Sequence, residues 1–270
     1  MSAAIGARMR RGGTIGRGVA AMLPGFCGLA VLLGLWWVGG VLLAATPSTS
    51  AFKAFAPGPA FAALEQMAVS GQLIQAALPS LGRIGAGLAI AILLGVPGGV
   101  AIGRVPWLRR ATYIPFQFLR MISPLSWMPV AVLLFPGWNG AIIFLIAIAA
   151  IWPVLFSTAH GVGRIDPAWL KVARNLRASF WDQILSVIMP AISQDVLSGI
   201  RLALGVAWIV LVPAEYLGVS SGLGYAISDA RDSLDYGRLM AVVIAIGVIG
   251  FGLDALCLAA IRRAAWKKDI

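Results

Sequence analysis

The sequence predicts an all-α integral membrane protein of about six transmembrane helices, with a helical cytoplasmic loop between the fourth and the fifth. Hydrophobic residues make up 60% of the 270-residue chain and charged residues only 11%, against about 25% charged residues in soluble proteins. The apolar residues gather in long runs, and most basic residues lie in the segments between these runs. A soluble core of this size does not bury so much apolar surface, so we expect lipid to cover much of it.

Six apolar runs are long enough to cross a hydrocarbon layer of about 30 Å, which takes about 20 helical residues. We expect each run to be helical because lipid offers an exposed backbone no hydrogen-bond partners. The third run is interrupted by prolines, so we expect it either to kink or to enter the membrane only part-way. The predicted spans are 20–45, 82–103, 114–136, 139–159, 196–217 and 239–261.

The basic residues indicate the orientation, because Lys and Arg gather in cytoplasmic loops. With both termini in the cytoplasm, fifteen of the 21 basic residues lie inside the cell. A cleaved signal peptide at the basic N-terminus is the alternative, and it leaves the orientation of the rest unchanged. The fifteen are Arg8, Arg10, Arg11, Arg17, Arg104, Arg109, Arg110, Arg164, Lys171, Arg174, Arg177, Arg262, Arg263, Lys267 and Lys268. Lys53, Arg231 and Arg238 lie outside, and Arg83, Arg120 and Arg201 lie within or at the edges of spans.

The chain is expected to form one membrane domain with short flanks. Residues 1–77 hold the N-terminus, the first span and an outside connection, residues 78–262 the main domain, and residues 263–270 a cytoplasmic tail. The net charge of +11 raises nucleic acid as a partner, but the basic residues lie between spans, so we expect none. The single histidine, His160, and the two distant cysteines are too few for a metal site.

The segment 161–195 between the fourth and fifth spans is expected to form two short amphipathic helices on the inner membrane face. Asp166 and Pro167 are typical of an N-cap and of the first helical position. An apolar stripe at helical spacing follows them. The stripe consists of Trp169, Val172, Ala173 and Leu176.

A second helix start follows at Ser179, which has the capping-box spacing to Asp182. Phe180 begins its apolar face, and Pro190 is expected to mark the turn into the fifth span. The two helices are either a linker on the membrane surface or a docking element for a cytoplasmic partner, since an exposed apolar stripe is otherwise a liability. The candidate docking residues are Asp166, Trp169, Lys171, Val172, Ala173, Leu176, Arg177, Ser179, Phe180 and Pro190.

Several residues inside the spans suggest roles in packing or passage. Gly95, Gly99 and Gly103 form a small-residue face, which serves either helix packing or a moving seam between two half-transporters. Ionisable residues are costly in lipid, so we predict that Arg201 and Asp254 pair across two helices, with separate snorkelling to the interface as the alternative.

The proline-broken third span carries candidates for lining a passage, because irregular backbone at membrane depth usually faces protein or water. These candidates are Ser123, Ser126 and Trp127. Glu215 lies near the outer end of the fifth span, before a glycine-rich turn, where a carboxylate is expected to be structural or gating.

The loop 161–195 resembles the permease signature of bacterial binding-protein-dependent importers, which reads E-A-A, three residues, G, nine residues, I-x-L-P. Here the same spacing holds Lys171-Val172-Ala173, then Arg177, then Val187-Ile188-Met189-Pro190. Arg177 in place of the glycine leads us to expect no left-handed backbone at that position. Residues 80–103, 119–132, 166–176 and 199–235 are similar to the nitrate, sulfonate, taurine and bicarbonate branch of these permeases.

This resemblance implies a subunit for ATP-driven import of a small anion or organic anion, such as nitrate, a sulfonate or taurine, across the bacterial inner membrane. The implied partners are cytoplasmic ATPase subunits, a periplasmic substrate-binding protein, and a second permease copy or a sibling. The ATPase subunits would bind the two helices of the loop 161–195, which are the coupling helices of this family. The sequence holds no Gly-Lys pair and therefore no P-loop, so we expect ATP use on another chain, and neither a cofactor nor an enzyme activity on this one. A secondary transporter or channel and a membrane enzyme are the alternatives, but neither repeat halves nor grouped catalytic residues are apparent.

Overall fold

The computed structural model describes residues 14–45 and 53–266, and all regular elements of this part of the chain are helices. The predicted all-α class is therefore confirmed. The chain divides into two compact units. Unit 1 comprises Met1–Gln66 and Asp235–Ala241, and unit 2 comprises Met67–Leu234 and Val242–Ile270.

Unit 1 contains α1 (Thr14–Ala45), most of α2 (Pro57–Val69) and the first residues of α11 (Tyr236–Trp266). The indole nitrogen of Trp36 donates a 2.9 Å hydrogen bond to the carbonyl oxygen of Phe55. The predicted first span falls in α1, whose described apolar part is Cys27–Leu42. The predicted positions of Arg8, Arg10, Arg11, Lys267 and Lys268 lie outside the described residues.

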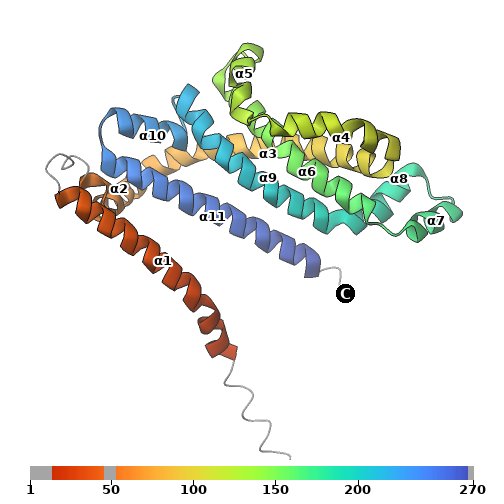
Figure 1. Cartoon of the computed structure of the whole chain (residues 1–270), viewed down its shortest axis with the longest axis horizontal. Coiled ribbons are helices and arrows are strands. Elements are labelled where there is room, and N and C mark those ends of the chain that lie inside the picture. Colours follow the sequence, from red (N-terminus) through yellow and green to blue (C-terminus); the bar gives the residue numbers. More distant parts are fainter. Residues whose placement is uncertain (1–13, 46–52, 267–270) are drawn as a thin grey trace, which may run out of the picture. The chain divides into compact units, whose positions relative to one another are not determined.

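Unit 2 holds the helices from α3 to α10, most of α11 and the broken segments between the long helices (Figure 1). Among the described residues, four helices are long and apolar enough to cross a membrane, namely α3, α6, the continuous helix Phe180–Gly218 and α11. The elements in order are α3 (Gln72–Arg104), α4 (Pro106–Met121), η2 (Pro124–Trp127), α5 (Met128–Leu134), α6 (Trp138–Gly163), α7 (Pro167–Asn175), α8 (Phe180–Asp182), η3 (Gln183–Ile188), α9 (Met189–Gly218), α10 (Leu223–Asp232) and α11.

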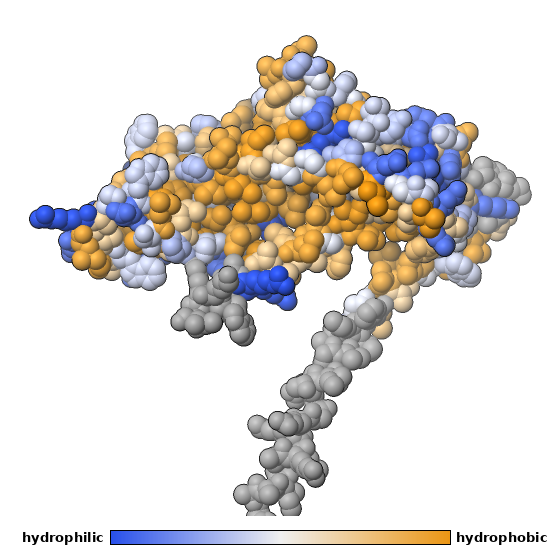
Figure 2. Space-filling model, turned by 180° about the vertical axis from the view of Figure 1, so that it is seen from behind, coloured by the Kyte–Doolittle hydropathy of each residue, from blue (hydrophilic) through white to orange (hydrophobic). Residues whose placement is uncertain are grey.

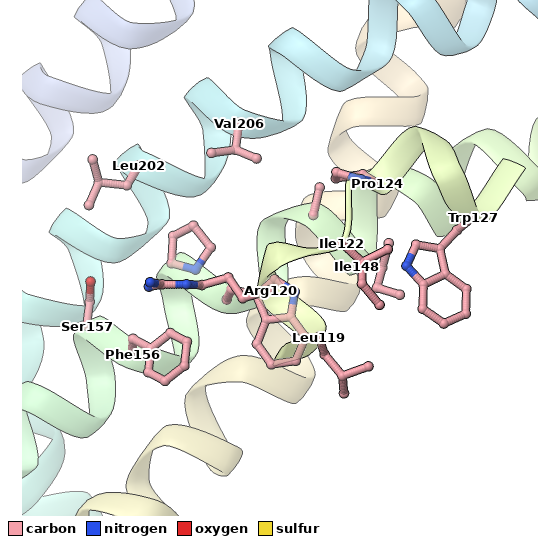
Figure 3. Close-up of a pocket in the computed structure, with 13 residues that line it drawn as sticks. Leu119, Arg120, Ile122, Pro124, Trp127, Ile148, Phe156, Ser157, Leu202 and Val206 are labelled. Atoms are coloured by element: carbon pink, nitrogen blue, oxygen red, sulfur yellow. The ribbon is translucent and has the colours of Figure 1, made fainter. Parts of the chain in front are cut away.

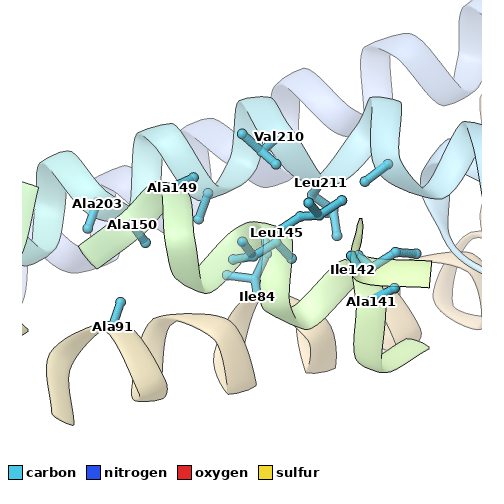
Figure 4. Packing of buried hydrophobic residues seen from close by; sticks show 14 of the residues in the cluster. Ile84, Ala91, Ala141, Ile142, Leu145, Ala149, Ala150, Ala203, Val210 and Leu211 are labelled. Atoms are coloured by element: carbon cyan, nitrogen blue, oxygen red, sulfur yellow. The ribbon is translucent and has the colours of Figure 1, made fainter. Parts of the chain in front are cut away.

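The core of unit 2 is built around α6, which packs against α3 and α9 (Figure 4). Ile142 and Leu145 of α6 are fully buried, as is Leu211 of α9, and Ile84 of α3 completes the contact. Alanines at the helix crossings let the backbones approach closely, which is how helices associate in lipid. The core is therefore a close-packed three-helix contact, and α6 is its central member.

Glycines on α3 pack against α6 in parallel register. A Cβ atom added at any of four α3 glycines would lie 2.5–3.0 Å from a side chain of α6. The pairs are Gly87 with Ile146, Gly95 with Val154, Gly99 with Thr158, and Gly103 with Val162. Since α6 of the same chain fills this face, the glycines serve helix packing, and the alternative of a seam with a second half-transporter is wrong.

The parallel register of α3 and α6 decides the path of the chain between them. Because residue numbers rise together along both helices, the end of α3 and the start of α6 lie at opposite ends of the packed pair. The connection 105–137 must therefore return along the full height of the pair. It does so as α4 and then η2 with α5, bent by 88°.

This connection is the predicted third span, and its geometry is that of a broken span. It starts at Pro106 rather than at residue 114, because Pro106 begins α4 directly after α3. With this span, residues 72–263 contain five candidate crossings. The predicted total of six is not confirmed. The apolar stretch of α1 that the structure describes, Cys27–Leu42, is shorter than each of the four full-length spans.

Large apolar side chains lie on the outside of the long helices. Leu93 of α3, Ile209 of α9 and Phe251 of α11 are among these exposed residues. Figure 2 shows apolar side chains over much of the visible face, with hydrophilic residues in separate groups along its edges. This pattern is the one that lipid requires, because a soluble monomer exposes only small apolar patches.

Candidate functional site

The loop after α6 begins with α7, whose start is set by Asp166 and Pro167. The carboxylate of Asp166 accepts a 2.8 Å hydrogen bond from the backbone N–H of Ala168, and Pro167 occupies the first helical position. This is the N-cap that the sequence predicts, since it satisfies an N–H that the helix cannot. The apolar stripe runs from Trp169 in α7 to Leu176, the C-cap residue of this helix.

The C-terminus of α7 overturns one expectation. Arg177 has φ 55°, a left-handed backbone, although the sequence predicts none there. The N–H of Ala178 bonds to the carbonyl of Ala173, and the N–H of Arg177 bonds to that of Arg174. These two bonds form a Schellman motif, which needs a left-handed residue at this position and usually takes glycine. Satisfying the helix-end carbonyls therefore outweighs the strain on Arg177.

The segment after Ser179 also differs from the prediction. The capping box forms, because Ser179 Oγ accepts from the N–H of Asp182 while the Asp182 carboxylate accepts from the N–H of Ser179. However, no turn follows at Pro190, and the helix continues from Phe180 to Gly218. The predicted second short helix is therefore the first part of the fifth span.

A π-helical turn explains why Pro190 does not break this helix. Proline removes one backbone N–H and its ring clashes with the carbonyl four residues earlier. Residues Gln183–Ile188 form a π-helix that ends two positions before Pro190, and the N–H of Met189 bonds to the carbonyl of Ile184. Such a widened turn shifts the backbone hydrogen bonds by one residue, so the helix can continue through the proline.

The stripe of α7 and the start of this long helix enclose a groove of about 690 Å³. Trp169, Val172 and Leu176 line it and are 57%, 57% and 77% exposed. Ala173 and Pro190 also line the groove, whereas Asp166, Lys171, Arg177, Ser179 and Phe180 do not. Of these, Phe180 lies under the guanidinium of Arg104, 5.5 Å from the ring centroid. The candidate docking residues thus divide into five that line the groove and five that do not.

The structure brings Arg201 and Asp254 together. Two 2.7 Å hydrogen bonds join the Nε and Nη2 atoms of Arg201 on α9 to the two carboxylate oxygens of Asp254 on α11. Such a bidentate pair neutralises two charges that are each costly in lipid. The pair lines a surface groove between α9 and α11.

A buried polar network at the other end of α9 was not predicted. Glu215 is fully buried and forms an ion pair with Arg83 of α3, whose Nη1 lies 2.5 Å from Oε1. Ser80 Oγ lies 2.8 and 2.9 Å from the two carboxylate oxygens and accepts from the N–H of Leu223. The Arg83 guanidinium also donates to Asn139 and to Ser221.

This network holds the start of α10 against α3 and α9. Glu215 accepts a 3.0 Å hydrogen bond from the N–H of Gly224, so its charge faces the N-terminus of α10. Gly222 has φ 111°, and a Cβ atom there would lie 2.4 Å from the Glu215 carboxylate. Glycine is thus required by both conformation and space. The cost of ionisable groups in spans, applied above to Arg201, is the signal that could have suggested a partner for Arg83.

A cavity of about 520 Å³ lies where the third span breaks (Figure 3). Trp127 of η2 and Arg120 at the end of α4 line it, together with residues of α6 and α9. Ser123 and Ser126, the other two candidates for passage lining, are exposed and do not line this cavity. The break therefore brings one of the three candidates into a cavity and adds Arg120 to it.

Residues 87–265 match the family model described as binding-protein-dependent transport system inner membrane component. The chain belongs to this family of membrane transport components. The match covers α6, the α7 loop, the Glu215 carboxylate and the broken span. The predicted family is thereby confirmed, and the chain is a multi-pass inner membrane component of a binding-protein-dependent transport system.

Curated relatives of this transport component are permease proteins. The nitrate import permease protein NrtB of Synechococcus elongatus is 36% identical over 182 residues, which are 66% of this chain and 65% of the relative. The bicarbonate transport system permease protein CmpB of the same species is 37% identical over 66% of this chain and 64% of its own length. The chain thus spans slightly less than two thirds of these relatives. The taurine transport system permease protein TauC of Escherichia coli is 31% identical over 87% of this chain and 86% of the relative.

Proposed function

We propose that the chain is the permease subunit of an ATP-driven, binding-protein-dependent importer for a small anion or organic anion. It forms the translocation pathway and alternates between outward-open and inward-open packings of its spans. ATP is bound and hydrolysed on separate cytoplasmic subunits, and this chain binds no cofactor. The names of the relatives support the nitrate, bicarbonate and taurine class of substrates.

The observation that carries this proposal is the open apolar groove beside α7. Trp169, Val172 and Leu176 are large and apolar, yet they lie exposed on a short helix that also carries Lys171 and Arg174. Aromatic and aliphatic anchors of this kind dominate protein interfaces when a partner covers them. The partner proposed for the groove is the ATPase subunit, which turns closure on ATP into movement of the spans.

The remaining partners follow from the same proposal. A periplasmic substrate-binding protein delivers the anion, and a second copy of this chain or a sibling completes the pathway in the bacterial inner membrane. Both termini lie in the cytoplasm. Ser123, Ser126 and Trp127 are proposed to face the passage, and the Arg201–Asp254 pair to hold α9 against α11 within the membrane.

Truncation of one groove anchor tests the proposed coupling. We expect Trp169→Ala to weaken association with the ATPase by about 2 kcal/mol, or roughly 30-fold, because a buried Trp anchor is lost. Co-purification of tagged permease with the ATPase and ATP-dependent uptake in vesicles are the two measurements. Arg174→Ala is the matched control, since Arg174 lies on the same helix and does not line the groove.

Unchanged association and uptake in Trp169→Ala would contradict the coupling role. Uptake at full rate by this chain alone, without ATP, would indicate a secondary transporter or channel instead.

A further inference from the structure

Two cavities follow one another along α6 and share two residues. The first, of about 520 Å³, lies along positions 148–157 of α6, and the second, of about 580 Å³, lies along positions 156–164. Arg120 and Phe156 line both cavities. From residue 148 to residue 164 an α-helix rises about 24 Å. The two cavities together therefore reach from the middle of α6 to its C-terminal end.

Arg120 is a cation without an anionic partner in the described part of the chain. Its guanidinium lies 5.3 Å from the centroid of the Phe156 ring, and within residues 14–45 and 53–266 this cation–π contact is its only interaction with another side chain. Neither cavity is lined by an Asp or a Glu. Figure 3 shows the Arg120 side chain extending across the first cavity beside Phe156 toward Ser157. Arg120 is exposed, so its guanidinium is accessible to an anion that enters the cavity, and no carboxylate lining the cavity offsets its attraction for that anion.

We propose that Arg120 binds the transported anion in the cavity at the break of the third span. This inference rests on the proposed import function and adds the residue that recognises the substrate. A guanidinium offers a planar fork of N–H donors that matches the oxygens of nitrate, bicarbonate, a carboxylate or a sulfonate. Ser157 and Trp127 line the same cavity, and their hydroxyl and indole groups are further hydrogen-bond donors.

The second cavity continues this positive lining toward the end of α6. Arg109 of α4, His160 of α6 and Arg164 at the C-cap of α6 line it. Arg164 lies 3.6 Å from Asp195, which partly offsets its charge, whereas Arg109 and Arg120 have no such acidic neighbour among the described residues. A row of cations lets an anion move from one partner to the next, provided that no single site binds it too tightly.

The experiment uses the complete transporter, with its ATPase and binding protein, in vesicles loaded with ATP. The probes are nitrate, bicarbonate and taurine. We expect Arg120→Gln to lower uptake at least tenfold while the amount of co-purified ATPase stays unchanged. Arg120→Lys is expected to keep intermediate uptake, because it retains the charge but loses the fork. Arg110→Gln is the matched control, since Arg110 lies on α4 and lines neither cavity.

Uptake by Arg120→Gln at the level of the unmodified chain would overturn the inference. A second measurement leaves Arg120 in place and introduces Ser157→Cys after Cys27 and Cys257 are replaced by Ala. Anionic thiol reagents should label this cysteine at least fivefold faster than cationic reagents of the same size, and the transported anion should slow the labelling. Equal rates without protection would also overturn the inference.

Two further comparisons complete the test. One distinguishes the transported anion from a lipid phosphate as the ligand of Arg120, and the other distinguishes failure of this inference from failure of the proposed function. A lipid phosphate is the alternative ligand of Arg120, so the uptake assay is repeated in vesicles of phosphate-free galactolipid. Loss of the difference between Arg120→Gln and the unmodified chain in these vesicles would overturn binding of the transported anion. Absence of ATP-dependent uptake by the unmodified transporter would contradict the proposed function itself, whereas the reagent preference at position 157 would still report the anion site.

Discussion

At the scale of single residues, the local conformation follows from which backbone groups must be satisfied. Arg177 is held in a left-handed conformation that costs a non-glycine residue roughly 1–2 kcal/mol. The structure keeps this conformation because the carbonyls of Ala173 and Arg174 would otherwise have no donor. The permease signature usually has glycine at this position, and the backbone of this chain is the one that glycine favours.

This strain predicts that Arg177→Gly stabilises the end of α7. We expect the amides of residues 176–178 to exchange with deuterium about fivefold more slowly, which corresponds to about 1 kcal/mol of relieved strain. Hydrogen exchange followed by mass spectrometry measures this change. Arg174→Gly is the opposite control, because glycine inside a helix costs about 1 kcal/mol and should speed exchange. Faster exchange in Arg177→Gly would show that the arginine side chain itself stabilises the loop.

At the scale of elements, buried polar groups decide which helix ends meet. Arg83 on α3 and Glu215 on α9 are both buried, and with Ser80 they bind the first turn of α10. The pair is fully desolvated, so each partner depends on the other. By contrast, the Arg201–Asp254 pair between α9 and α11 is about 40–46% exposed.

The buried pair predicts a double-mutant result. Removing one partner leaves a buried charge unpaired, which costs about 3–5 kcal/mol. We therefore expect Arg83→Met and Glu215→Leu each to lower the thermal aggregation midpoint in detergent strongly, and the double variant to lower it less than the sum of the two. Size-exclusion chromatography after heating measures the midpoint. Asp254→Leu, at the half-exposed pair, is the control and should have a smaller effect.

Strictly additive losses in the double variant would show that Arg83 and Glu215 are stabilised by their other hydrogen bonds rather than by each other.

At the scale of the whole molecule, helix directions and charge agree on one topology. α3 and α6 run parallel, while α9 runs antiparallel to α6, because Gly161 lies against Asp195 and Gly199 against Ser157. The end of α3, the start of α4, the end of α6 and α7 therefore share one side. This side carries Arg104, Arg109, Arg164 and Lys171, and the excess of basic residues indicates the cytoplasm.

This topology predicts which positions react from each side of the membrane. In a chain with Cys27 and Cys257 replaced by Ala, we expect Arg231→Cys to react with a membrane-impermeant maleimide in intact spheroplasts. Arg174→Cys should react only after the membrane is opened, because the proposed orientation places α7 in the cytoplasm. Mass-shift gels measure both reactions. Labelling of Arg174→Cys from outside would reverse the proposed orientation.

The sequence by itself determined the membrane class, the approximate spans, the N-cap at Asp166, the capping box at Ser179 and the family. These features depend on apolar runs and on contacts within about one helical turn, which a linear sequence displays directly. Only the tertiary structure decided the partner of Glu215, which lies 132 positions from Arg83, the path of the broken span, and the cavity around Arg120. These depend on which helices pack together, and in lipid that choice comes from surface fit and polar pairing rather than from apolar pattern.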